Sequence, residues 1–177
     1  HSKSVYNCAM YEYRIEGGFP IKGTIKASGN KNAALPCIAA SLLTSEKVIL
    51  RSIPEIEDTG VMLLILQSFG AKVEKLSENA WEINASEISR NDIPPELSKK
   101  IRASILFAGP LLARTGKAIM PPPGGDVIGR RRLDTHFLAL EELGARVSID
   151  RKFEFSANKL VGSDIFLDET SVTATEN

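Results

Sequence analysis

The sequence lacks an excess of charge of either sign, since its 177 residues contain 22 Lys and Arg against 22 Asp and Glu. This balance argues against nucleic acid or an anionic membrane surface as a partner, and only local clusters of charge are informative. No apolar run approaches the roughly 20 residues of a membrane span. The opening HSKSVYNCAM has no long apolar core and does not read as a secretory signal.

Cysteine and histidine are also scarce. Cys8 and Cys37 form no close pairing motif, which argues against a disulfide framework and against a zinc site. We interpret Cys37 as a small core residue and His136, the only interior histidine, as structural. These shortages predict a reducing, cytoplasmic compartment. Because the chain begins with His rather than Met, residues 1–12 are interpreted as a tag or a disordered leader.

The sequence does contain an internal repeat. LILQSFGAKVEKL, residues 64–76, is similar to LALEELGARVSID, residues 138–150, and the two Gly-Ala pairs lie 74 positions apart. Upstream, ASLLTSEKVILRSIP is similar to GPLLARTGKAIMPPP, with Lys47 and Lys117 separated by 70 positions. The two spacings differ by four residues, and these extra residues fall between the two anchors, where the second unit has a loop rich in Pro and Gly.

The sequence pattern of each repeat unit predicts the order β-α-β-α-β-β. This alternation of helices and strands predicts an α/β or α+β fold. Small apolar residues favour first helices over 32–43 and about 99–113, followed by strands near 47–51 and 117–120. An amphipathic helix ending in Gly comes next, and the strand pairs AKVEKL with AWEINA and ARVSID with FEFSA close the units.

The predicted units span about residues 22–86 and 95–158. The chain ends in SVTATEN after the strand-like DIFLDE, and this resembles the SGNKNAA that opens the first unit. We interpret residues 163–177 as the start of a third unit, and the chain as a fragment of a longer protein. An ordinary polar C-terminus is the alternative.

Basic residues lie where several helices are predicted to start. A helix N-terminus has unpaired N–H groups and partial positive charge, which favour acids, as in PEIEDTG. Lys31, Arg102 and Arg131 reverse this rule, and each reversal costs a few tenths to about 1 kcal/mol at an exposed site. The pattern favours a bound phosphate or carboxylate that compensates the charge. Three solvated basic faces are the alternative.

The loop PPPGGDVIGRRR has Gly124-Gly125 for flexibility and one acid, Asp126, beside three arginines. This composition is typical of a lid with a carboxylate for proton transfer. A surface turn with an ion pair has the same composition.

Together, SGNKNAALP, RASILFAGPLLAR, PGGDVIGRRRLDTHFLALEELGA and SVTATEN resemble the UDP-N-acetylglucosamine 1-carboxyvinyltransferase family of enolpyruvyl transferases, from residue 13 to 177. The similarity covers about the first 40% of such an enzyme. It implies an inverted α/β prism built from repeated β-α-β-α-β-β units, with two complete units and the start of a third in this chain.

The resemblance implies transfer of the enolpyruvyl group of phosphoenolpyruvate to the 3-hydroxyl of UDP-N-acetylglucosamine, with release of phosphate. This is the first committed step of peptidoglycan synthesis, and it implies no metal and no cofactor. The missing C-terminal domain of the same protein is the expected partner. Without it, the exposed apolar surface favours a homodimer, and the fragment alone is expected to be inactive.

By motif, the resemblance places Lys31 and Asn32 at the phosphoenolpyruvate pocket and Arg102 at the anionic substrates. Asp126 and Lys31 are the expected catalytic residues. The residues expected to border the uridine and diphosphate are Arg131, Arg132, Leu133, Asp134 and Thr135, and those expected to touch the nucleotide sugar are Ser171 and Val172.

Two positions depart from the family. Asp126 stands where most members have cysteine, and because a carboxylate forms no thioether with fosfomycin, we expect insensitivity to that epoxide. Thr173 stands where the family usually has Gly, which weakens the assignment of the nucleotide contact. The alternatives are a 3-phosphoshikimate 1-carboxyvinyltransferase and a noncatalytic nucleotide-sugar binding module. The Asn-Lys-Asn of SGNKNAALP and the PGG of the loop favour the amino-sugar enzyme.

Overall fold

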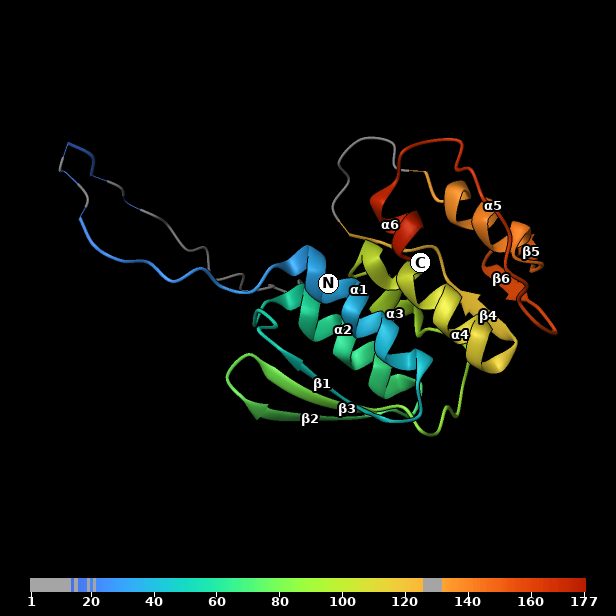
Figure 1. The fold of residues 1–177 in the computed structure, drawn as a ribbon, viewed down its shortest axis with the longest axis horizontal. Helices are drawn as coiled ribbons and strands as arrows, with labels where there is room; N and C mark the ends of the chain where they lie inside the picture. The colour runs from blue at the N-terminus through green and yellow to red at the C-terminus, as the bar shows by residue number, and fades with distance from the viewer. Residues whose placement is uncertain (1–13, 15, 19, 21, 126–131) are drawn as a thin grey trace, which may run out of the picture.

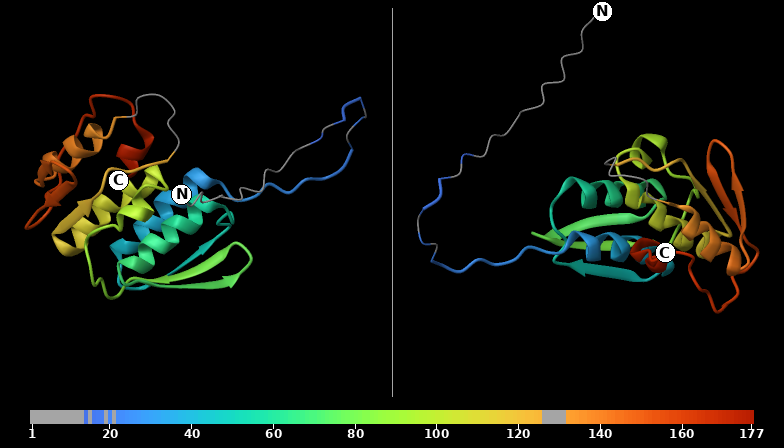
Figure 2. Two further views of the ribbon diagram at one scale, coloured as in Figure 1. Left: turned by 180° about the vertical axis from the view of Figure 1, so that it is seen from behind. Right: turned by 90° about the horizontal axis from the view of Figure 1, so that it is seen from above.

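The computed structural model describes residues 14, 16–18, 20, 22–125 and 132–177. Two three-stranded sheets are packed with helices, and the helices of the N-terminal half gather on one side of the first sheet (Figure 1). The second sheet and the C-terminal helices lie on the other side of that helical layer (Figure 2). No helix among the described residues has the length and apolar character needed to cross a membrane.

The first repeat follows the predicted order closely. It consists of α1 (Lys31–Ala40), the 3-10 turn η1 (Ser41–Leu43), β1 (Lys47–Arg51), α2 (Glu57–Ser68), β2 (Lys72–Ser77) and β3 (Ala80–Asn84). Helix α1 begins where it does because Asn30 caps it, and the Oδ1 of Asn30 accepts hydrogen bonds from the N–H groups of Asn32 (2.8 Å) and Ala33 (3.3 Å).

The second repeat has the same strands but a different first helix. It consists of α3 (Pro95–Ser98), the 3-10 helix η2 (Arg102–Phe107), α4 (Ala108–Thr115), β4 (Lys117–Met120), α5 (Asp134–Glu142), β5 (Arg146–Ile149) and β6 (Phe153–Ser156), and the chain then ends in α6 (Val172–Glu176). The prediction of one helix over about 99–113 is therefore wrong.

The break between η2 and α4 has a physical cause. The carboxamide of Asn177 lies between two backbone groups that a continuous helix would join. Its Oδ1 accepts from Gly109 N (3.0 Å) and its Nδ2 donates to Ile105 O (3.2 Å). A side chain inserted into the hydrogen-bond ladder ends regular α-helix at that point. A Cβ on residue 109 would lie 2.4 Å from Asn177 O, so only glycine fits there.

The two sheets repeat each other in order and register. Their strand orders are β1-β3-β2 and β4-β6-β5, all antiparallel. Lys47 and Lys72 both pair with Asn84, as Lys117 and Arg146 both pair with Ser156. The preceding helices end at glycines with positive φ, +104° at position 70 and +94° at position 144. The internal repeat is thus confirmed at the level of backbone geometry.

Some predicted strands are absent from the described residues. Residues 22–30 form no strand before α1, and in the second repeat the first strand is reduced to one parallel bridge between Asp92 and Ile119. The strand-like segment 164–169 is irregular. Ile25 and Phe166 are 93% and 94% exposed, so neither segment has a neighbour to cover its apolar side chains.

One continuous core joins the two repeats. Phe69, at the end of α2, packs edge to face on Phe107 of η2, with ring centroids 5.4 Å apart and planes at 79°. Helix α2 buries most of its apolar side chains in this core. Cys37 is exposed on α1, so its prediction as a core residue is wrong.

Candidate active site

A cavity of about 810 Å³ lies where the starts of α1, α2, η2 and α6 converge. Its lining includes four basic residues and three acidic ones, and the wall is completed by the backbone at Gly125. The charged residues of the wall are Lys31, Lys100, Arg102, Arg132, Glu57, Asp58 and Glu169. The cavity therefore holds a nearly balanced set of charges, most of them from residues at or beside helix starts.

Lys31 reaches across to the start of the neighbouring helix. Its Nζ lies 2.8 Å from Asp58 Oδ2, and both side chains are partly exposed to the cavity. The Asn30 cap fixes the position of Lys31, while Asp58 belongs to a first turn that Thr59 holds through hydrogen bonds from its Oγ1 to Pro54 O (2.6 Å) and Ile56 O (2.9 Å). The charge of Lys31 is thus compensated by Asp58 within the chain.

Arg102 begins η2 and lies at the base of the loop. Its Nη2 donates to Arg132 O over 2.9 Å, which connects it to the first described residue beyond the loop. On the other side, Gly124 N donates to Ser98 O (2.9 Å), and a Cβ on Gly124 would lie 1.8 Å from Lys99 O. Glycine is required here by close backbone approach, which is a different reason from the flexibility inferred from the sequence.

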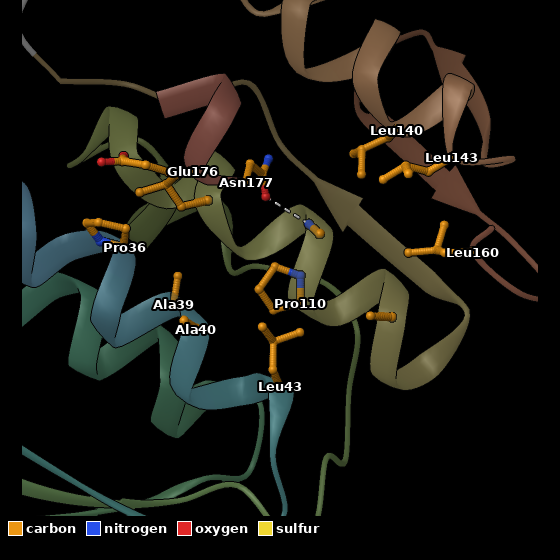
Figure 3. A pocket seen from close by; sticks show the side chains of 13 residues that line it. Pro36, Ala39, Ala40, Leu43, Pro110, Leu140, Leu143, Leu160, Glu176 and Asn177 are labelled. Atoms are coloured by element: carbon orange, nitrogen blue, oxygen red, sulfur yellow. Dashed lines mark hydrogen bonds between the residues drawn. The ribbon is translucent and has the colours of Figure 1, made fainter. Parts of the chain in front are cut away.

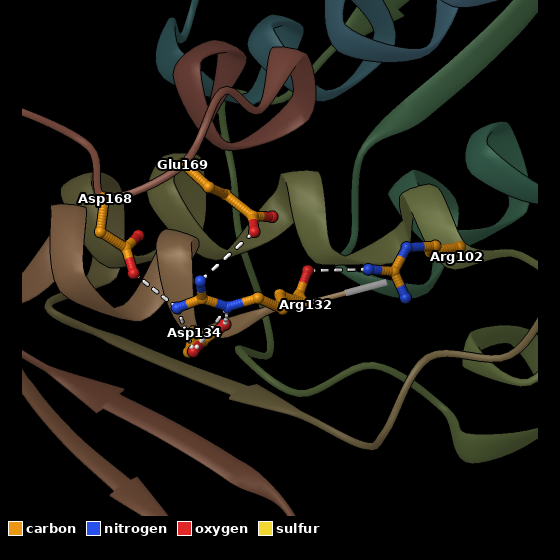
Figure 4. Close-up of polar contacts among 5 residues, drawn as sticks. All are labelled: Arg102, Arg132, Asp134, Asp168 and Glu169. Carbon is orange, nitrogen blue, oxygen red and sulfur yellow. Dashed lines mark hydrogen bonds and ion pairs between the residues drawn. The ribbon is translucent and has the colours of Figure 1, made fainter. Parts of the chain in front are cut away.

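Arg132 is surrounded by carboxylates (Figure 4). Its Nε bonds both carboxylate oxygens of Asp134 (2.9 and 3.0 Å), its Nη2 bonds Asp134 Oδ2 (2.7 Å) and Asp168 Oδ2 (2.5 Å), and its Nη1 bonds Glu169 Oε2 (3.3 Å). These contacts raise the pKa of Arg132 above its usual range, and the hydrogen bonds from Arg132 lower the pKa of Asp134.

The other sequence-predicted residues divide into two groups. Asn32, Ser171 and Val172 line the cavity beside Lys31 and Arg102. Leu133 packs against the core, and Thr135 is buried with no hydrogen-bond partner for its Oγ1 among the described residues. Leu133, Asp134 and Thr135 are not among the cavity residues. The predicted Asp126 and Arg131 lie outside the described residues.

Ser171 is placed by its role as the N-cap of α6, since its Oγ accepts from Ala174 N over 3.3 Å. Ala174 is buried, which anchors the short helix. Lys100, one of the basic residues that the sequence places at the start of the helix predicted over about 99–113, also lines the cavity, whereas sequence reasoning missed Asp58 and Glu169. Asp58 follows the helix-start rule, so it gave no unusual signal, and only its contact with Lys31 shows its place.

His136 and Asn177 connect α5 to α6 behind the cavity. Asn177 Nδ2 lies 3.0 Å from His136 Nδ1, which therefore serves as the acceptor on the neutral ring. Burial, with a smaller contribution from the charge of Arg102, lowers the pKa of His136 to about 4. The histidine is structural in this arrangement.

An apolar pocket of about 220 Å³ lies beyond Asn177, between α1, α4 and α5 (Figure 3). Its lining includes Pro36 of α1, Leu43 of η1, Pro110 of α4 and Leu140 of α5. It has no charged residue apart from Glu176 at its rim. Its lining suits packing against another apolar element better than binding of an anion.

The arrangement of helices and sheets matches solved enolpyruvyl transferases. The enolpyruvyl transferase NikO from Streptomyces tendae superposes with a TM-score of 0.68 at 24% identity, over 83% of this chain and 32% of that one. An EPSP synthase from Acinetobacter baumannii superposes with a TM-score of 0.66 at 15% identity, over 87% of this chain and 36% of that one. The fold is therefore that of the enolpyruvyl transferases.

Comparison of the sequence with known proteins identifies the family within this class of fold. The family of EPSP synthase (3-phosphoshikimate 1-carboxyvinyltransferase) matches residues 15–177, and the chain belongs to that family. The chain is 66% identical over 168 residues to a UDP-N-acetylglucosamine 1-carboxyvinyltransferase of Treponema denticola, and 62% identical over 165 residues to that of Treponema pallidum. These matches cover 95% and 93% of this chain and 39% of each relative, so the chain spans well under half the length of the relatives.

Proposed function

We propose that this chain carries part of the active site of a UDP-N-acetylglucosamine 1-carboxyvinyltransferase. Such an enzyme moves the enolpyruvyl group of phosphoenolpyruvate to the 3-hydroxyl of UDP-N-acetylglucosamine and releases phosphate, in the cytoplasm, as the first committed step of peptidoglycan synthesis. The observation that carries the proposal is the 66% identity to a relative of that name, against 15% identity to the EPSP synthase structure.

The cavity supports this proposal because both substrates are anions. Lys31 is proposed to neutralise the phosphate or carboxylate of phosphoenolpyruvate, with Asn32 beside it, and Arg102 to contact the anionic substrates. An entering anion would take over from Asp58 as the partner of Lys31, which lies only 2.8 Å from that carboxylate. Binding is then an exchange of ion pairs, with little new desolvation of the ammonium group.

Asp126 is proposed to protonate the methylene carbon of phosphoenolpyruvate while the sugar hydroxyl attacks the neighbouring carbon and gives up its own proton to solvent. The tetrahedral intermediate then expels phosphate, and its new methyl group loses a proton, which restores the double bond. A carboxylic acid can serve as the donor if closure of the site raises its pKa. Arg131 is proposed to border the uridine and diphosphate.

The rest of the site is proposed to come from further protein. The chain spans 39% of its relatives, and the apolar pocket beside Asn177 is the surface that further helices would cover. For the chain alone, a homodimer is proposed to cover this surface.

The test is turnover by the complete reading frame that encodes this chain. We expect phosphate release with phosphoenolpyruvate and UDP-N-acetylglucosamine, and none with shikimate-3-phosphate. Lys31→Ala should lower kcat/KM by about 100-fold or more, since it removes a charge at the reacting group. Lys159→Ala, an exposed lysine outside the cavity, is the control and should have no effect. Binding of the nucleotide sugar without turnover would favour a noncatalytic module instead.

The loop residue gives an independent test of the same proposal. The parent enzyme should keep its activity in fosfomycin, because Asp126 offers no thiol for the epoxide. Asp126→Cys should introduce time-dependent inactivation. Rapid inactivation of the parent enzyme would contradict the assignment of Asp126 to the position of the proton donor.

A further inference from the structure

The guanidinium of Arg132 is engaged by three carboxylates that come from two separate segments. Asp134 is the first residue of α5, whereas Asp168 and Glu169 lie in the irregular segment that leads to α6. The contact with Asp134 is bidentate, which fixes the plane of the guanidinium. Arg132 therefore joins α5 to a segment 36 residues away in the sequence.

This junction lies next to residues of the cavity wall. Ser171 follows Glu169 by two positions, caps α6 through its Oγ and lines the cavity together with Val172. On the opposite side, the carbonyl of Arg132 accepts a hydrogen bond from Arg102 Nη2 over 2.9 Å. The backbone and the side chain of Arg132 thus connect η2, α5 and the segment before α6.

The charges around Arg132 decide between two roles for it. Three carboxylates surround one guanidinium, so without the arginine they would repel each other and the segment at 168–169 would move away from α5. A diphosphate that used Arg132 as a ligand would have to compete with all three of them. The guanidinium is instead placed to hold the protein together.

We propose that Arg132 is a positioning residue, which holds Asp168 and Glu169 and thereby keeps Ser171 and Val172 on the cavity wall, where they recognise the nucleotide sugar. This proposal rests on the proposed function and is an alternative to the sequence expectation that Arg132 itself borders the diphosphate. Arg102 and Lys100 line the same cavity.

The variant Asp168→Asn separates the two roles of Arg132, because they predict opposite changes in the affinity for UDP-N-acetylglucosamine. Asp168 is not part of the cavity lining, so it acts on the ligand through Arg132. If Arg132 positions Ser171, the variant should bind UDP-N-acetylglucosamine about threefold more weakly, the scale of a partly exposed charged network. If Arg132 is a diphosphate ligand, removing a competing carboxylate should tighten binding.

The matched control is Asp164→Asn, which removes the same charge from the same segment. Asp164 makes no ion pair with any other described residue, so its variant should leave the affinity unchanged. Arg132→Gln should weaken binding about as much as Asp168→Asn, and the double variant should be no weaker than either alone, because both break one network. Arg132→Lys should recover only part of the affinity, since an ammonium cannot form the bidentate contact. Tighter binding by Asp168→Asn, or additive losses in the double variant, would overturn the proposal.

A second measurement does not depend on any substrate. Amide exchange of the isolated chain, followed by NMR, should be about threefold faster at Thr175 and Asn177 in Asp168→Asn than in Asp164→Asn, because α6 loses an anchor. If the complete enzyme failed to bind the nucleotide sugar, the proposed function would fail while this measurement still decided the role of Arg132. Equal exchange rates in the two variants would contradict that role.

Discussion

Helices α2 and α5 occupy the same place in the two repeats, yet equivalent positions near their starts carry opposite charge. A shift of 74 positions places Asp58 of the first repeat on Arg132 of the second. The sheets beneath them have the same order and register. Both charged residues are partnered, Asp58 by Lys31 and Arg132 by three carboxylates. The repeat therefore preserves the scaffold, while the residues at and just before the helix starts set the charge of the cavity.

The two repeats also differ in how tightly the ends of these helices pack. Phe69 at the end of α2 is fully buried against Phe107, whereas Leu143 at the equivalent end of α5 is half-buried beside the apolar pocket. The end of α2 is therefore packed more tightly than the end of α5, which borders the apolar pocket that further protein is proposed to cover.

The largest expected difference between the repeats follows from this packing. Phe69→Ala should lower the free energy of unfolding by about 3 to 5 kcal/mol, because it removes a buried ring and leaves a cavity. Leu143→Ala should cost about 1 kcal/mol, since less apolar area is lost from burial. Urea denaturation of both variants measures the difference. Equal losses would show that the two helix ends are packed alike.

The second expected difference between the repeats is in the pH dependence of stability, which a buried histidine of the second repeat causes. The shift of 74 positions places His136 on Met62, and both are buried. The pKa of His136 is lowered from 6.5 to about 4, so between these values the unfolded chain binds a proton that the folded chain does not. Stability should therefore fall by about 2 kcal/mol from about pH 7 to about pH 5, and this dependence ends below the folded pKa.

His136→Met, which copies the first repeat, should abolish this pH dependence in unfolding experiments while sacrificing the bond to Asn177. Carboxylates with lowered pKa values, such as Asp134, lose their stabilising effect at lower pH and do not interfere in this range. A pH dependence that persisted in the variant would assign it to another group.

The elements that the sequence predicted correctly are those with local causes. The helix ends at Gly70 and Gly144 and the paired strands follow from periodicity and turn chemistry within a few residues. The predicted helix over about 99–113 failed because Asn177, 68 positions from Gly109, enters its hydrogen-bond ladder. No local pattern carries that information.

The sequence likewise indicated only some of the residues that line the cavity. Lys31 and Arg102 were found because a cation at a helix start is unfavourable and needs a reason. Asp58 obeys the rule for helix starts, so it was passed over, although it is the partner of Lys31. Arg132 was grouped with neighbouring arginines, and the ion pairs on which its proposed separate role rests are with Asp168 and Glu169, which are distant in sequence.

The smallest expected difference concerns two buried threonines, each in the first turn of its helix. In α2, the Oγ1 of Thr59 donates to backbone carbonyls, including Pro54 O at 2.6 Å. In α5, the Oγ1 of Thr135 has no partner among the described residues. Thr59→Val should lower the free energy of unfolding by about 1 to 2 kcal/mol, because it removes the hydrogen bond from a buried hydroxyl to Pro54 O.

Thr135→Val should be neutral or should stabilise the fold by up to about 1 kcal/mol, because it removes a buried hydroxyl that makes no hydrogen bond to the described residues. The two variants change the same atoms, so differences in propensity and volume largely cancel between them. Thermal unfolding of the pair provides the measurement. A loss at Thr135 as large as that at Thr59 would mean that its hydroxyl is bonded in solution, and the first turns of α2 and α5 would then be held in the same way.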